Sequence, residues 1–250
     1  MNNQIAFCRQ GNVEVVVGSG MHAFPLHTHQ SYLFGAVLRG SAAFVIDHTQ
    51  AQLHKGNTYL VPSNTGMGME PVDAFSYLTI CLRGKQADRL KQCHVSKYFP
   101  TTNADALLEL TRKFLTKDLE EDGYVQGLVQ LFGLMDSCQA ITCNADMMTA
   151  GRYLQQHADV KFDLDALAKN MHVSKFHFIR SFQRQWGVTP KQHHQQCKVR
   201  FIRENIEQLT QSQAAYALGF ATQSHMGAVF KKYMGITLKE YRDSLRRATS

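Results

Sequence analysis

Two histidines near the amino terminus have a spacing that suggests a binding site. His27 and His29 are two residues apart in a segment with β-strand character, and such side chains point to the same face of a strand. Two imidazoles on one face can hydrogen-bond a small molecule or begin a metal site. Phe34 and Tyr59 could supply the apolar wall of a small-molecule site. We therefore predict a ligand site formed by His27, His29, Phe34 and Tyr59. The alternative is that the two histidines are only polar residues at the mouth of a β-barrel.

A second set of side chains suits contact with nucleic acid. Within residues 175–186, Phe178 and Phe182 are four apart and share the inner face of a predicted helix. The outward stripe consists of Lys175, Phe176, Ile179, Arg180 and Gln183. Arginine can pair in bidentate fashion with a guanine edge, and an apolar side chain can pack on a thymine methyl group. We predict that this stripe contacts DNA.

The elements around this stripe form a helix-turn-helix pattern. A helix capped by Asp163 extends to Met171, and the two-residue turn His172-Val173 follows it. Ser174 then caps the second helix, which ends at Gly187. In a helix-turn-helix unit the second helix enters the major groove, so this segment is predicted to be the reader helix.

The same pattern recurs downstream. Residues 211–218 form a short predicted helix, residues 219–221 the turn, and residues 222–234 a second reader helix that Gly235 ends. Its predicted DNA contacts are Gln223 and Ser224 on bases and Lys231 on phosphate. Between the units, Lys191 to about Gln208 could form one helix of about 18 residues and roughly 27 Å. A spacer of this length would hold two readers near the ~34 Å separation of successive major-groove faces.

Charge is distributed unevenly along the chain. Residues 1–145 hold 11 lysines and arginines against 12 aspartates and glutamates, a balance of −1, whereas residues 146–250 hold 16 against 8, a balance of +8. A positive field of this size attracts polyanions, because neutralising phosphates releases condensed counterions. The charge balance thus supports a nucleic-acid partner for the carboxy-terminal part.

The pattern of the chain predicts two domains of an α+β protein. Short β-type runs from His27 to about Leu82 predict a small amino-terminal all-β domain, either a barrel or a sandwich, and residues 103–139 predict two helices that form a packing or dimerisation layer. We predict an amino-terminal domain at 1–140, a linker at 141–147 and an all-α domain at 148–250. The cysteines are scattered without metal spacing, and no window resembles a signal peptide or membrane span, so a reduced, cytoplasmic protein is expected.

The carboxy-terminal segments LAKNMHVSKFHFIRSFQRQWGVTPKQ and ALGFATQSHMGAVFKKYMGITLKEYR resemble the AraC/XylS family of bacterial transcription regulators. The resemblance covers about 100 residues and implies a double helix-turn-helix domain that binds double-stranded promoter DNA. Two positions depart from the family pattern: Leu238 stands where proline is usual, and Ala228 where a basic reader often lies. The second unit is therefore expected to discriminate bases less sharply.

The amino-terminal segment HTHQSYLFGAVLRGSAAFVIDHTQAQLHKGNTYLVPS more loosely resembles the cupin-like effector domain of this family. A cupin metal centre would need a carboxylate and a third histidine, and these are missing after His29 and Pro62, so no metal, cofactor or enzymatic activity is expected. The resemblance implies a small-molecule effector, activation through RNA polymerase and a homodimer. Two alternatives stay open: a constitutive regulator whose β-domain only dimerises, and a cupin metalloenzyme fused to a DNA-binding tail.

Overall fold

The computed structural model describes residues 4–90, 93–95, 97–136, 145–206 and 208–248. The amino-terminal part contains strands β1 (Gln4–Gln10), β2 (Val13–Gly20), β3 (Phe24–Thr28), β4 (Tyr32–Arg39), β5 (Ser41–Ile46), β6 (Thr49–His54), β7 (Thr58–Val61), β8 (Gly66–Pro71) and β9 (Phe75–Leu82). Short elements follow at α1 (Gly84–Leu90), β10 (Cys93–His94) and β11 (Met135–Asp136), and the longer helices α2 (Ala104–Leu115) and α3 (Glu121–Leu131) lie before β11. The strands thus begin earlier than predicted, since β1 and β2 precede His27.

Strands β1 to β9 form two antiparallel sheets, and β10 pairs with β11 in a third. The closed barrel implied by the cupin resemblance is thereby corrected. One sheet has the order β1-β2-β9-β4-β7 and the other β3-β8-β5-β6. No strand pairing joins them within the described residues, so the barrel is not closed. Two of the four edge strands of these sheets are in contact with helices: α10 packs on β1, and α7 and α9 pack on β3.

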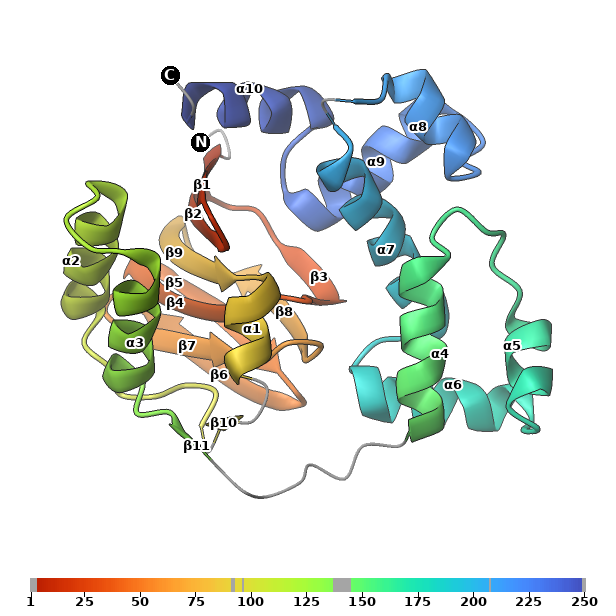
Figure 1. The fold of residues 1–250 in the computed structure, drawn as a ribbon, viewed down its shortest axis with the longest axis horizontal. Coiled ribbons are helices and arrows are strands. Elements are labelled where there is room, and N and C mark those ends of the chain that lie inside the picture. The colour runs from red at the N-terminus through yellow and green to blue at the C-terminus, as the bar shows by residue number, and fades with distance from the viewer. Residues whose placement is uncertain (1–3, 91–92, 96, 137–144, 207, 249–250) are drawn as a thin grey trace.

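Alternation along the strands separates two cores. Tyr32, Phe34 and Ala36 of β4 point to the outer face, where they pack with α2 and α3. Leu33 and Val37 point between the two sheets. Figure 1 shows α2 and α3 together on the far side of the sheets from the carboxy-terminal helices. The predicted helical layer at 103–139 is therefore present, and it covers the outer face of the five-stranded sheet.

The carboxy-terminal part is entirely helical. Its elements are α4 (Ala145–Gln156), α5 (Leu164–Asn170), α6 (Lys175–Trp186), α7 (Pro190–Glu204), α8 (Gln211–Ala217), α9 (Gln223–Met234) and α10 (Leu238–Ala248). Most of the predicted linker lies outside the described residues, and α4 already begins at Ala145. None of the helices in the described ranges is long and apolar enough to cross a bilayer.

The two helical units are packed differently. The first has its own core, centred on the fully buried Phe178 and Phe182. The second shares one continuous core with the inside of the β-sheets, to which α9 and α10 contribute Phe230, Tyr233 and Tyr241. In Figure 1 helix α10 lies beside the end of β1, and α7 runs between the sheets and the first unit. The second unit and α7 are therefore docked on the β-domain.

Candidate functional site

The first helix-turn-helix unit is built by local signals. The side chain of Asp163 accepts a hydrogen bond from Ala166 N (3.0 Å), and Ser174 accepts one from His177 N (3.3 Å), so each helix has an N-cap. His172 has a φ of 53° in the turn, and Gly187 ends α6 with a φ of 70°. The inner face of α6 is anchored by Trp186, whose Nε1 donates to Met147 O at 2.8 Å. These contacts cap both helices and tie the end of α6 to α4.

The outer face of α6 carries the predicted reader residues. Phe176 is 78% exposed, which is unusual for so large an apolar side chain. Arg180 and Gln183 are exposed on the same stripe, while Ile179 is half-buried. Lys175 is exposed but forms an ion pair with Asp165 of α5. The structure thus brings the five predicted residues to one exposed face.

The second unit repeats this construction. Thr222 caps α9 by accepting a hydrogen bond from His225 N at 3.0 Å, and Gly235 ends the helix with a φ of 74°. The predicted contacts on this helix are all exposed, namely Gln223, Ser224 and Lys231. The side-chain amide of Gln223, at the start of α9, donates a hydrogen bond to the hydroxyl of Ser212 in the first turn of α8.

The spacer between the units is shorter than predicted. Helix α7 spans 15 residues from Pro190 to Glu204, or about 22 Å at 1.5 Å per residue. Thr189 and Gln192 form a capping box at its start, and Asn205 is its C-cap. The predicted extension to Gln208 fails because the chain turns at Asn205 before Thr210 caps α8.

His27 and His29 lie together at the end of β3. The Nδ1 atom of His27 is 2.7 Å from Pro25 O and must donate to it, so the Nε2 atom of a neutral His27 is an acceptor. His29 Nε2 lies 2.7 Å from that atom and is therefore the donor. Burial lowers the pKa of His27 to about 4, and burial together with the neighbouring His27 lowers the pKa of His29 well below 6.5. Both rings are neutral at pH 7.

The other two residues of the predicted ligand site lie on opposite faces of the five-stranded sheet. Tyr59 points between the sheets, and its hydroxyl is 2.6 Å from Thr79 Oγ1. Phe34 points to the outer face and packs on Phe132 with ring centroids 4.9 Å apart. The prediction for Phe34 is therefore wrong. The cause is that β4 turns its even-numbered side chains toward α2 and α3.

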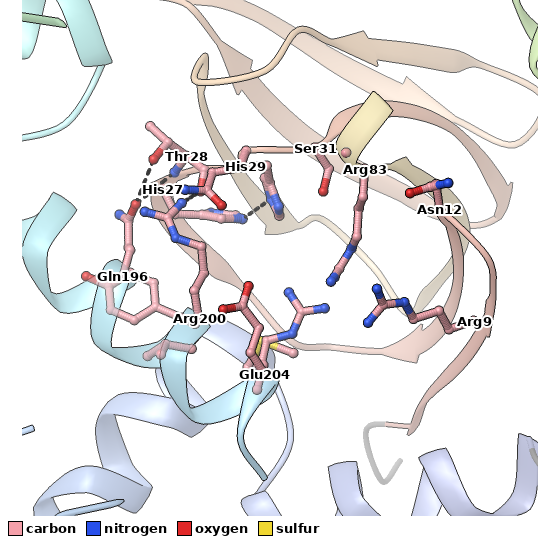
Figure 2. Close-up of a pocket in the computed structure, with 16 residues that line it drawn as sticks. Arg9, Asn12, His27, Thr28, His29, Ser31, Arg83, Gln196, Arg200 and Glu204 are labelled. Atoms are coloured by element: carbon pink, nitrogen blue, oxygen red, sulfur yellow. Dashed lines mark hydrogen bonds between the residues drawn. The ribbon is translucent and has the colours of Figure 1, made fainter. Parts of the chain in front are cut away.

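A cavity of about 390 Å³ opens where β3 meets α7. Its lining comes from both parts of the chain and includes His27, His29, Arg83, Arg200 and Arg203. An apolar space of about 90 Å³ continues between the sheets, past Tyr59, and shares both histidines with the first cavity. Figure 2 shows Arg9 and Arg83 pointing into the larger cavity from the side opposite Arg200 and Gln196.

Buried polar contacts tie α7 to the β-domain at this cavity. Arg203 Nη2 donates to Glu14 Oε1 at 2.6 Å and to Glu14 Oε2 at 2.8 Å, and Arg83 also pairs with Glu14. Gln196 Oε1 accepts hydrogen bonds from Thr28 N and Thr28 Oγ1, each at 3.0 Å. Sequence reasoning missed these residues, since partners 168 to 189 positions apart leave no local signal.

No group of three or more histidine, cysteine or acidic side chains suited to a metal ion occurs in the part of the chain that the structure describes. The pair of His27 and His29 instead offers a hydrogen-bonding edge to the cavity. The arrangement can hold a small polar or charged molecule in contact with both α7 and the β-domain.

Comparison with known proteins assigns both parts of the chain. Residues 12–148 match the AraC-like ligand binding domain, and residues 167–244 match a helix-turn-helix domain. The MmsAB operon regulatory protein of Pseudomonas aeruginosa is 29% identical over 97 residues, which are 38% of this chain and 32% of that protein. The HTH-type transcriptional regulator YbfI of Bacillus subtilis is 22% identical over 226 residues, or 82% of each protein. Both relatives are named as regulators.

The fold is shared with ToxT from Vibrio cholerae. An apo variant of ToxT superposes with a TM-score of 0.62 at 13% identity, covering 95% of this chain and 99% of that one. ToxT with a bound unsaturated fatty acid superposes with a TM-score of 0.60 at 14% identity, covering 98% of each chain. The two-domain α+β architecture, the ligand-binding family match and the double helix-turn-helix agree, and the chain belongs to the AraC family of helix-turn-helix transcription regulators.

Proposed function

We propose that this regulator recognises promoter DNA by inserting α6 and α9 into successive major grooves. The observation that carries the proposal is the exposed stripe of α6, where Phe176 and Arg180 face solvent while the opposite face is fully buried. A rigid helix with an apolar and a guanidinium side chain on its free face suits readout of thymine methyl groups and guanine edges.

The two readers are proposed to divide the work. On α6, Arg180 and Gln183 contact base edges, Phe176 and Ile179 provide apolar contacts, and Lys175 lies near the backbone. On α9, Gln223 and Ser224 contact bases and Lys231 contacts phosphate. Ala228 is exposed on α9 and offers no hydrogen bond, so the first reader carries more of the sequence preference.

The regulator is further proposed to respond to a small molecule at the junction cavity, by which we mean the cavity of about 390 Å³ between β3 and α7 together with the space of about 90 Å³ that continues from it between the sheets. His27, His29 and Tyr59 reach this space, and α7, which connects the two readers, forms its other wall. A ligand there contacts both parts of the chain and shifts the population of their arrangements. The solved ToxT complex with an unsaturated fatty acid supports a small-molecule effector in a protein of this fold.

We propose that the ligand-binding part, 1–140, also forms a homodimer, while residues 148–250 bind DNA. Leu108 and Leu115 of α2 are 37% and 38% exposed and, seven residues apart, share one face of the helix. An exposed leucine pair on the outer helical layer suits contact with a second copy. Activation through RNA polymerase is proposed on the family resemblance alone.

The test of the function uses the full-length chain, because an isolated carboxy-terminal fragment would expose the core shared with the β-domain. Selection from a random double-stranded library should yield two half-sites about one helical turn apart. A variant with Phe176→Ala and Arg180→Ala should lose that selection, whereas the exposed Arg39→Ala in β4 should keep it. Selection of no sequence, or of the same sequence by the reader variant, would contradict the proposal. A ligand panel that never shifts the melting temperature would favour the constitutive alternative.

A further inference from the structure

We propose that the junction cavity binds a compact organic anion, whose charged group pairs with Arg83, Arg200 and Arg203 in competition with Glu14. This inference rests on the proposed effector site and names the chemical class of its ligand.

The cavity has an excess of positive charge. Four arginines face it, namely Arg9, Arg83, Arg200 and Arg203, while Glu14 and Glu204 are the acidic residues around the two connected spaces. The histidines do not add to the charge, since their lowered pKa values keep them neutral. Two positive charges are therefore left over in a partly enclosed space, where a counter-charge is worth more than in water.

The arginines differ in how they are already satisfied. Arg200 donates to Thr28 O at 3.4 Å and to Cys197 Sγ at 3.1 Å, and it has no carboxylate partner among the described residues. A neutral carbonyl and a thiol are weak partners for a guanidinium group, which pairs best with a planar anion. Arg200 lies on α7 beside Gln196. An anion bound to Arg200 would therefore touch the helix that connects the two helix-turn-helix units.

Glu14 occupies the position that a ligand's carboxylate would contest. Its side chain is 4% exposed and lies between Arg83 of the β-domain and Arg203 of α7. One carboxylate in the wall of the smaller space thus serves two guanidinium groups that also line the larger cavity. An incoming anion near Arg83 and Arg203 would share or replace this partner, so Glu14 is expected to weaken ligand binding.

The apolar space limits the rest of the ligand. It measures about 90 Å³ and is walled by Leu33, Tyr59, Met67 and Tyr77. A cavity of about 150 Å³ holds one benzene ring, so this space admits only a few carbon atoms and an aromatic ring would lie in the larger cavity. A long alkyl chain would need the sheets to separate. A branched short-chain or aromatic carboxylate fits both the charge and the size.

The test measures binding to the full-length chain by calorimetry and by melting temperature. The probes are benzoate and 3-methylbutanoate, their uncharged amides, palmitoleate, and sodium sulfate. At least one compact carboxylate should bind ten or more times tighter than its amide, than palmitoleate and than sulfate. Equal binding of acid and amide, or tighter binding of palmitoleate or sulfate, would overturn the proposal.

Variants separate the roles of the charged groups. Arg200→Gln should weaken the carboxylate at least tenfold, and the matched exposed control Arg39→Gln should leave it unchanged. Glu14→Gln should tighten binding at least threefold, and Glu14→Asp, which keeps the charge but shortens its reach, serves if the first variant does not fold. Unaltered affinity in Arg200→Gln, or no gain in the folded Glu14 variant, would refute the assignment. DNA binding by the same preparations is measured in parallel: a protein that selects DNA but binds no carboxylate refutes only this inference.

Discussion

Replacing Arg180 with alanine should relax base discrimination at one position of the DNA site without cost to stability. The guanidinium group is exposed on α6 and makes no hydrogen bond or ion pair within the described residues, so its loss breaks no internal contact. One bidentate contact with a guanine is worth about 1–3 kcal/mol, which corresponds to roughly a 5- to 150-fold loss of affinity for the selected site. The preference at one base step should relax by the same factor, since the contact that distinguishes the bases is gone.

The assay compares Arg180→Ala with Lys231→Ala on a selected site and on randomised half-sites across a salt series. Lys231 is exposed on α9, and as a phosphate contact its loss should weaken specific and non-specific binding about equally. The slope of log K against log salt should fall by about 0.9 for that variant. If Arg180→Ala kept the base preference while Lys231→Ala changed it, the division between reader and phosphate contact would be wrong.

Three further predictions concern stability. Glu14→Ala should lower the free energy of unfolding by about 3–5 kcal/mol in urea titrations, because Arg83 and Arg203 would lose their buried carboxylate partner. Glu109→Ala, at an exposed position of α2, is the control and should leave the free energy of unfolding nearly unchanged. Phe182→Ala removes a fully buried ring of the first unit and should cost about 3–5 kcal/mol, whereas a loss under 1 kcal/mol would contradict the described core. Burial lowers the pKa of His27 to about 4 and that of His193, on α7, to about 3, so as the pH falls the unfolded chain binds protons before the folded chain does. The free energy of unfolding should therefore decrease below pH 6.5, by up to about 1.4 kcal/mol per pH unit for each histidine. An unfolding free energy that is independent of pH between 6.5 and 4.5 would count against the burial of these two side chains.

The helix-turn-helix units could be predicted because their signals are local. Asp163, Ser174 and Gly187 each act within a few residues, so the bounds of α5 and α6 follow from the sequence nearly as the structure has them. The face of each helix also follows, since 3.6 residues per turn fix which side chains share a side. This is why the predicted reader residues lie together on exposed faces.

The ligand site was harder to predict because it depends on relations between strands. The alternation of side chains along β4 shows that Leu33 and Phe34 lie on opposite faces of the sheet, but not which of them faces His27. The pairing register of the strands decides this, and it places Phe34 beside Leu60 of β7 and Ile80 of β9. The helices that pack on the edge strands β1 and β3 also come from far along the chain, so this packing leaves no local signal. The arginines of the cavity come from β1, the end of β9 and α7, and only the fold brings them together.

Helix α7 is the element through which a ligand can reach the DNA-binding units. Its residues Val199 and Ile202 are buried in the core shared with the β-sheets, while Arg200 and Arg203 face the cavity. Helix α7 begins shortly after Gly187, the residue that ends the first reader, and the second helix-turn-helix unit comes after Glu204, the last residue of α7. A helix of 15 residues with a capping box moves as a rigid body more readily than it bends. A change in the partners of Arg203 would alter how α7 sits against Glu14 of β2. The first reader, α6, ends just before α7 begins, and the second reader, α9, follows α7 through α8.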